Sequence, residues 1–173
     1  MYKVSLPRLD LAVKVGNVAI KPALSLMAWA EFIKSGNTAY SYGDLVVLED
    51  EINPVISKLE ERGLGVSALH NHLLRETPRI MYIHFDGRGD EVDMAKGIRA
   101  ALALTKSLLV STVSAPETQP EIASEIEKII GHKGNIGGGV FHITVPRNDV
   151  HVMAGGDDDP RRHGDEHSAQ FPD

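Results

Sequence analysis

Apolar and polar positions alternate along much of the first third of the chain. Residues 2–6 and 11–15 alternate on either side of a proline-containing turn, which predicts two half-buried strands. The runs 23–33 and 38–48 are separated by a short loop containing Gly36, and they predict a hairpin. We therefore expect antiparallel sheet in this region.

The pattern changes to helical spacing after residue 48. Three acids at 49–51 precede apolar residues spaced three and four apart up to Gly63, which predicts a helix with acids in its first turn. Two β-type runs follow, 65–72 and 79–86, and then an Ala- and Leu-rich helix over 91–106. The order β, β, β, β, α, β, β, α predicts an α+β domain, a mainly antiparallel sheet with helices on one face.

The remaining third of the chain divides into shorter segments. We predict a strand over 108–113, a linker over 114–120, an amphipathic helix over 122–130 and a flexible glycine-rich turn over 134–139. The predicted organisation is a main unit over 1–113, a region over 114–156 that echoes the start of a second unit, and a charged, disordered tail over 157–173.

The echo is visible in the letters of the sequence. GVFHITVPRNDVHVMAG, residues 139–155, matches MYKVSLPRLDLAVKVG at the start of the chain. Arg147 and Asp149 fall on Arg8 and Asp10, and the offset between the two copies is constant. The chain is therefore predicted to hold one nearly complete repeat and the opening of another.

Composition narrows the range of functions. The 173 residues include 42 % hydrophobic and 24 % charged positions, as expected for a globular domain with a core. The net charge of −6 and the lack of a basic stripe argue against nucleic acid. No apolar run approaches the roughly 20 residues of a membrane span. Because there is no cysteine, any metal must be held by His, Asp or Glu.

Three histidines and a glutamate are concentrated in the stretch ALHNHLLRETPRIMYIHF. His70 and His72 alternate on one predicted strand, and His84 lies on the strand expected to pair with it, so their imidazoles should share one face. Glu76, in the connection, could be a fourth ligand or the general base. We predict a divalent metal ion, zinc first, with manganese, iron or copper as alternatives. The competing interpretation is that the histidines form an ordinary polar sheet face.

Two further residues are candidates for binding a substrate. Asp44, in the predicted strand 38–48, could line the same cleft as the histidines. Arg8 follows a proline at a strand end and could bind a carboxylate, although a structural salt bridge repeated at Arg147 explains it as well.

These residues support three functions. The first is a metal-dependent hydrolase of small esters or lactones, with metal-activated water and Glu76 moving the proton. A cupin-like oxygenase is a second possibility, because H-x-H, a glutamate and a later histidine on β-structure resemble the cupin ligand pattern. The third is a non-catalytic metal- or ligand-binding module.

The segments YKVSLPRLDLAV, IKPALSLMAWAEF, GDLVVLEDEINPVISKLEERG and ALHNHLLRETPRIMYIHFDGRGD resemble the bacterial LppY/LpqO-like lipoprotein family. The resemblance covers about residues 1–106 and resumes over 122–155. It implies two copies of this unit and an extracytoplasmic location, and it implies no particular reaction. The sequence departs from that pattern in lacking an export signal, a lipobox cysteine and most of the second copy. A unit without its mate would expose an apolar face, so we predict a homodimer, with residues 122–154 completing the first unit in cis or by exchange.

Overall fold

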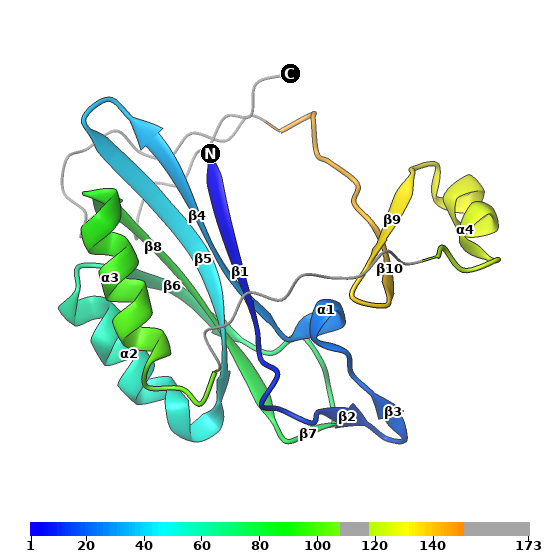
Figure 1. The fold of residues 1–173 in the computed structure, drawn as a ribbon, viewed down its shortest axis with the longest axis horizontal. Coiled ribbons are helices and arrows are strands. Elements are labelled where there is room, and N and C mark those ends of the chain that lie inside the picture. The colour runs from blue at the N-terminus through cyan, green and yellow to red at the C-terminus, as the bar shows by residue number, and fades with distance from the viewer. Residues whose placement is uncertain (108–117, 151–173) are drawn as a thin grey trace.

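The computed structural model describes residues 1–107 and 118–150. Its centre is a five-stranded antiparallel sheet in the order β1-β4-β5-β8-β6, so the predicted α+β class is confirmed. β1 forms one edge of the sheet and β6 forms the other (Figure 1). The five strands are β1 (Tyr2–Pro7), β4 (Met27–Ser35), β5 (Thr38–Leu48), β6 (Gly65–His70) and β8 (Ile80–Gly89).

Two helices cover one face of this sheet (Figure 1). The 3-10 turn η1 (Glu49–Glu51) leads into α2 (Ile52–Glu61), and α3 (Glu91–Leu102) begins where Asp90 accepts hydrogen bonds from the backbone N–H groups of Val92 and Asp93. The core between helices and sheet is apolar, because side chains of alternate strand positions point to this layer. It includes Leu45, Val47, Ile83, Phe85, Val55, Leu59, Met94, Ile98 and Ala101.

The first predicted hairpin is largely confirmed. β5 has the predicted bounds, and β4 pairs with it through a loop in which Gly36 takes a positive φ of 61°. The start of the predicted strand 23–33 is wrong, because Pro22 begins a short helix, α1 (Pro22–Ser25), before β4. Residues 11–15 are also mostly not a strand. Only β2 (Lys14–Val15) forms, and it pairs with β3 (Val18–Ala19) and β7 (Glu76–Thr77) in a separate small sheet.

Gly43 allows the two central strands to pack against the core, and its replacement is a clear test of the fold. A Cβ at this position would lie 2.5 Å from the carbonyl oxygen of Trp29 and would also collide with the ring of Phe85. Backbone on one side cannot yield, so Gly43→Ala is expected to lower the free energy of unfolding by at least about 2 kcal/mol in urea titrations. Gly89→Ala is the matched control, because nothing lies within 4 Å of its added Cβ. Equal stability of the two variants would contradict this packing.

The region after residue 118 forms a small substructure of its own. α4 (Ala123–Ile130) confirms the predicted helix, and Gly131 ends it at a positive φ of 81°. The predicted glycine-rich turn is wrong in extent, since β9 (Gly134–Gly137) and β10 (Val140–Ile143) form a hairpin closed by Gly138 and Gly139. The predicted strand 108–113, most of the linker and the predicted tail lie outside the described residues. Within the described part, no helix is long and apolar enough to cross a membrane.

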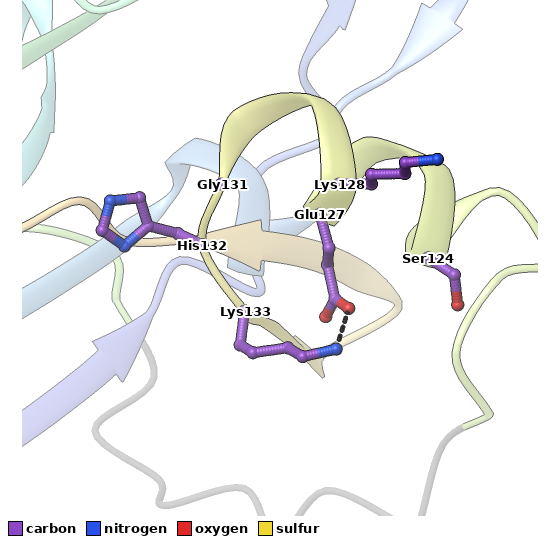
Figure 2. Close-up of a pocket in the computed structure, with 6 residues that line it drawn as sticks. All are labelled: Ser124, Glu127, Lys128, Gly131, His132 and Lys133. Carbon is purple, nitrogen blue, oxygen red and sulfur yellow. Dashed lines mark hydrogen bonds and ion pairs between the residues drawn. The ribbon is translucent and has the colours of Figure 1, made fainter.

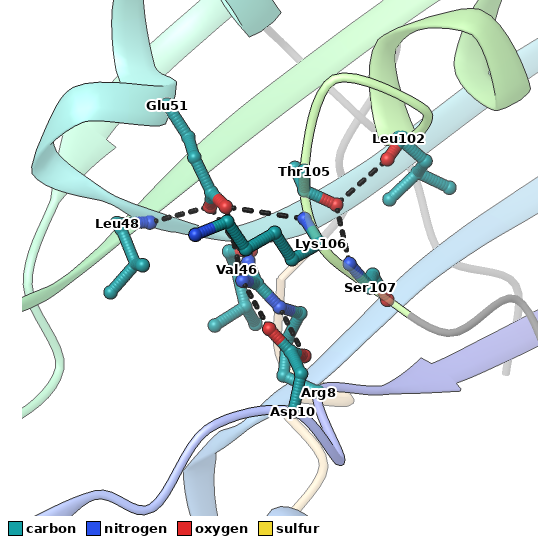
Figure 3. Close-up of polar contacts among 9 residues, drawn as sticks. All are labelled: Arg8, Asp10, Val46, Leu48, Glu51, Leu102, Thr105, Lys106 and Ser107. Carbon is teal, nitrogen blue, oxygen red and sulfur yellow. Dashed lines mark hydrogen bonds and ion pairs between the residues drawn. The ribbon is translucent and has the colours of Figure 1, made fainter.

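Arg8, the residue after β1, is fully buried and belongs to a polar network (Figure 3). Its guanidinium donates twice to Asp10, twice to Glu51 and once to the carbonyl of Val46, at distances of 2.7–3.2 Å. These five bonds use all five N–H donors of the side chain. The interpretation of Arg8 as a substrate-binding residue is therefore corrected: it joins β1 to the start of α2.

Candidate metal centre

The register of three strands brings the candidate residues together on the face opposite the two helices. In β5 and β8, Asp44 pairs with His84, and His84 also lies opposite Ala68 of β6. Two residues further along β6, His70 pairs with Tyr82. Since alternate residues of a strand share a face, Asp44, His84, His70 and Tyr82 all project to the same side.

The three predicted histidines converge there. One nitrogen from each of His70, His72 and His84 lies within 4.8 Å of the others. The imidazole rings of His70 and His72 stack with centroids 4.9 Å apart, and those of His70 and His84 are 4.8 Å apart. His72 follows the end of β6 rather than extending the strand, and its ring is held by stacking on Tyr82 at 3.5 Å. The predicted convergence of the histidines is thus confirmed.

Asp44 supplies a buried carboxylate directly beside them. Its Oδ2 lies 3.8 Å from Nε2 of His72 and 3.8 Å from Nε2 of His84. Its Oδ1 is buried and, among the described residues, has no hydrogen-bond partner. A buried carboxylate oxygen without a partner is costly, which is why such oxygens in proteins usually pair with a donor or a cation. Asp44 therefore places a buried carboxylate next to the three imidazoles, although it is not itself part of the group of converging ligand atoms.

Tyr42 fixes the orientation of His84. Its hydroxyl lies 2.6 Å from Nδ1 of His84, and its ring is in turn packed edge-on against Trp29, with centroids 5.2 Å apart. Because Nδ1 is engaged by Tyr42, the Nε2 atom of His84 is the one turned toward Asp44. Partners of this kind set which imidazole nitrogen is available as a ligand.

Burial controls the charges of this cluster. It raises the pKa of Asp44 to about 6, with the nearby His70 opposing the shift. Burial also lowers the pKa of His72 and of His84, and the neighbouring histidines lower both further. Both shifts favour the neutral form of His72 and His84, which is the form of an imidazole that binds metal ions.

The donor set fits a divalent metal ion. Zinc binds imidazole nitrogen at about 2.0–2.1 Å, so nitrogens sharing one tetrahedral ion stand roughly 3.4 Å apart. The three nitrogens now lie within 4.8 Å of one another, so they would have to move closer together to share one ion. Three imidazoles with a carboxylate beside them suit zinc, manganese, iron or copper, and the residue types do not choose among them.

Glu76 does not join this cluster. It lies in β7, where it pairs with Val15 of β2, and its Oε1 accepts a hydrogen bond from the backbone N–H of Ile80 at 3.3 Å. Among the described residues, the group of possible ligand atoms consists of the three histidines, and it includes neither Glu76 nor Asp44. The prediction of Glu76 as ligand and base is therefore corrected, because the connection between β6 and β8 forms a small sheet instead of folding back. Asp44 is the carboxylate at this position.

Sequence reasoning did not identify Tyr42 or Tyr82. Tyr42 carried a usable signal, since it stands two residues before Asp44 on a strand whose bounds were predicted, and so shares its face. Tyr82 has the same relation to His84 on β8. What was missing was the pairing of β5 with β8, which places the two strands side by side.

Comparisons with known proteins give one family and nothing more specific. No curated protein matches the chain, and no solved structure matches it. A family described as a domain of unknown function, DUF1259, matches residues 1–104, which include the five-stranded sheet, α2 and α3. The match covers more than half of the 173 residues. The chain therefore belongs to the DUF1259 family.

Proposed function

We propose that this protein is a metal-dependent hydrolase of small esters or lactones, with His70, His72 and His84 as the metal ligands. The observation that carries the proposal is the convergence of three imidazole nitrogens beside the buried carboxylate of Asp44, whose Oδ1 has no hydrogen-bond partner among the described residues. Bound by three histidines, a divalent ion lowers the pKa of a bound water and polarises a carbonyl group. The nucleophile is then water, so no serine or cysteine is required.

The chain's own residues supply the remaining functions. Asp44 is positioned to accept a proton beside the ligands, since its Oδ2 lies 3.8 Å from two of them. Tyr42 holds His84, and Tyr82 holds His72 by stacking. This sheet face is not covered by α2 or α3, and 38 % of the His72 side chain is exposed, so a small substrate can approach from that side.

The first test is the metal content of the purified, tag-free protein. We expect about one equivalent of zinc or manganese in the wild type and none in the double variant His70→Ala/His72→Ala, with circular dichroism confirming that both are folded. Ester and lactone hydrolysis should be present in the metal-containing wild type and absent from the metal-free double variant. Bound iron or copper with oxidase activity would replace this proposal with the cupin-like oxygenase. A metal without turnover would point to the binding module, and no metal after reconstitution would exclude the site.

Tyr42→Phe tests how His84 is oriented. Loss of the hydroxyl removes the partner of Nδ1 and is expected to weaken zinc binding by about 10- to 100-fold in chelator competition. Tyr40→Phe is the matched control, because Tyr40 lies on the same strand and face but donates its hydroxyl to Asp86 at 3.3 Å. If both variants bound zinc as tightly as the wild type, Tyr42 would have no part in the site.

We further propose a small-molecule substrate and a homodimer. The relation to LppY/LpqO-like lipoproteins rests on the sequence segments quoted above and stays a prediction, as does an extracytoplasmic location. Two uncovered apolar surfaces support the homodimer: one on α4 and one between β1 and α3.

A further inference from the structure

The helix-bearing face of the sheet is not fully covered at its β1 edge. A cavity of about 200 Å³ lies between α3 and the first two strands, with apolar walls from Val4, Leu6, Phe32 and Ile98. A second hollow, about 460 Å³, continues from it past Ala95 toward the N-terminus. We call these two hollows the β1 groove. β1 is also an edge strand, so the groove is bordered by backbone that pairs on one side only.

α4 carries an apolar stripe that its own surroundings leave exposed. Ile122, Ile126, Ile129 and Ile130 recur at helical spacing on one side of the helix. The exposed fractions of Ile122, Ile129 and Ile130 are 57 %, 74 % and 50 %. A stripe of this kind normally packs against another element. We call it the isoleucine stripe.

The other side of α4 is already occupied. Glu127 is buried and accepts hydrogen bonds from Nζ of Lys133 at 2.7 Å and from the backbone N–H of Gly134 at 2.9 Å (Figure 2). The hairpin that follows is anchored to the main unit, since Lys21 donates to the carbonyl of Gly139 at 3.0 Å and Gly138 packs against Ala23. α4 and the hairpin are thus joined, and α4 projects away from the five-stranded sheet (Figure 1).

The internal echo relates the hairpin that follows α4 to the strand that borders the β1 groove. At the constant offset, β10 corresponds to β1, and Phe141, Ile143 and Val145 correspond to Tyr2, Val4 and Leu6. The turn that follows is reproduced in structure as well, because Arg147 donates to Asp149 through the same two nitrogens as Arg8 to Asp10. In this second copy, α4 comes directly before the hairpin of β9 and β10.

We propose that the isoleucine stripe of one chain docks into the β1 groove of a second copy of this chain. Docking within one chain would require the contacts of Gly138 and Lys21 to break, whereas a second copy meets α4 where it already projects. The charges are also complementary: Glu125 flanks the isoleucine stripe, and Arg99 lines the β1 groove. Each chain offers one stripe and one groove, so two reciprocal contacts close a two-fold dimer.

Cross-linking with engineered cysteines tests this arrangement, because the chain has no cysteine of its own. Ala95→Cys places a thiol at the groove, and Ile129→Cys places one on the stripe. After the two single variants are mixed and mildly oxidised, we expect a disulfide-linked dimer containing one chain of each kind. Leu74→Cys, exposed in the connection between β6 and β8, replaces Ile129→Cys in the control mixture and should give no such product.

Light scattering of the full chain completes the test. We expect twice the chain mass for the wild type and a single chain mass for Ile129→Glu/Ile130→Glu. Ile33→Glu is the control and should remain dimeric, because Ile33 is about as exposed as Ile130 but lies on the sheet face opposite the groove. A monomeric wild type, a cross-link within one chain of Ala95→Cys/Ile129→Cys, or a dimer unaffected by the stripe substitutions would each overturn the proposal. Metal binding is measured separately, so failure here leaves the proposed hydrolase untouched.

Discussion

Arg8→Met is expected to lower the free energy of unfolding by about 3–5 kcal/mol, the cost of removing one partner from a buried ion-pair network. Methionine fills much of the space but donates no hydrogen bond. Glu51 then keeps a buried charge without its cation, and the carbonyl of Val46 loses its donor at 2.7 Å. Urea unfolding followed by fluorescence of Trp29 measures the difference.

Arg147→Met provides the matched control for Arg8→Met. Arg147 makes the same bidentate pair with Asp149, but 72 % of its side chain is exposed. Exposed pairs contribute about 0–1 kcal/mol, so the change in stability should be small. If the two variants lost similar stability, the burial of Arg8 would not be the source of its contribution.

The network also predicts how stability depends on pH. The hydrogen bonds from Arg8 lower the pKa of Asp10, against the opposing effect of burial. Because the folded-state pKa lies below the unfolded one, the contribution of this pair is present above the usual aspartate range and is lost as the pH falls through the folded-state pKa. The stability difference between wild type and Arg8→Met should therefore shrink in acid. If the stability difference between wild type and Arg8→Met grew as the pH fell, the prediction would be wrong.

The fold was predictable where sequence periodicity and local chemistry agree. β5 has the predicted bounds because a glycine turn precedes it and three acids follow it. α3 begins at the predicted residue, Glu91, but it ends at Leu102 and not at residue 106. Two of the wrong predictions share a cause. Residues 11–15 and Glu76 were assigned to long strands or to the site, whereas short pairings between β2, β3 and β7 use those residues. Two-residue strands depend on tertiary contacts and leave no periodic signal.

The histidine cluster was predictable because the H-x-H pair lies at the end of β6 and the third histidine lies on β8, the strand that pairs with it. Asp44 was harder to place, since its proximity arises from the pairing of β5 with β8 across about forty residues of sequence. Arg8 shows the opposite problem. An arginine after a proline looks available to a substrate, and only the three-dimensional position of Glu51 shows that all its donors are used.

Asp44→Asn is expected to lower the rate of ester or lactone hydrolysis by about 10²- to 10⁴-fold, the usual contribution of a general base. Burial raises the pKa of Asp44 to about 6, which is close to the value that suits proton transfer near neutral pH. Asparagine keeps the shape but cannot accept the proton. Zinc content and kcat/KM, measured on the same samples, separate loss of chemistry from loss of metal.

Asp86→Asn is the control for this loss of rate. Asp86 is also a buried carboxylate on the same face of β8, two residues from His84, but it pairs with Tyr40 rather than with the histidines. Its rate should remain within a few-fold of wild type. Equal losses in the two variants would mean that a general change of charge on this face, rather than a base at Asp44, accounts for the effect.

Asp44→Asn should not destabilise the metal-free protein. The pKa of Asp44 is about 6 in the folded protein, against the usual 3.8. Ionisation of this carboxylate as the pH rises therefore lowers the free energy of unfolding, by at most about 3 kcal/mol. At pH 8, metal-free Asp44→Asn is thus expected to be at least as stable as wild type, and this advantage should vanish below about pH 4. A clear loss of stability at pH 8 would show that Asp44 supports the fold. A gain in stability with a loss of turnover is the pattern of a residue placed for chemistry, because a carboxylate buried at a cost to folding needs another reason to be there.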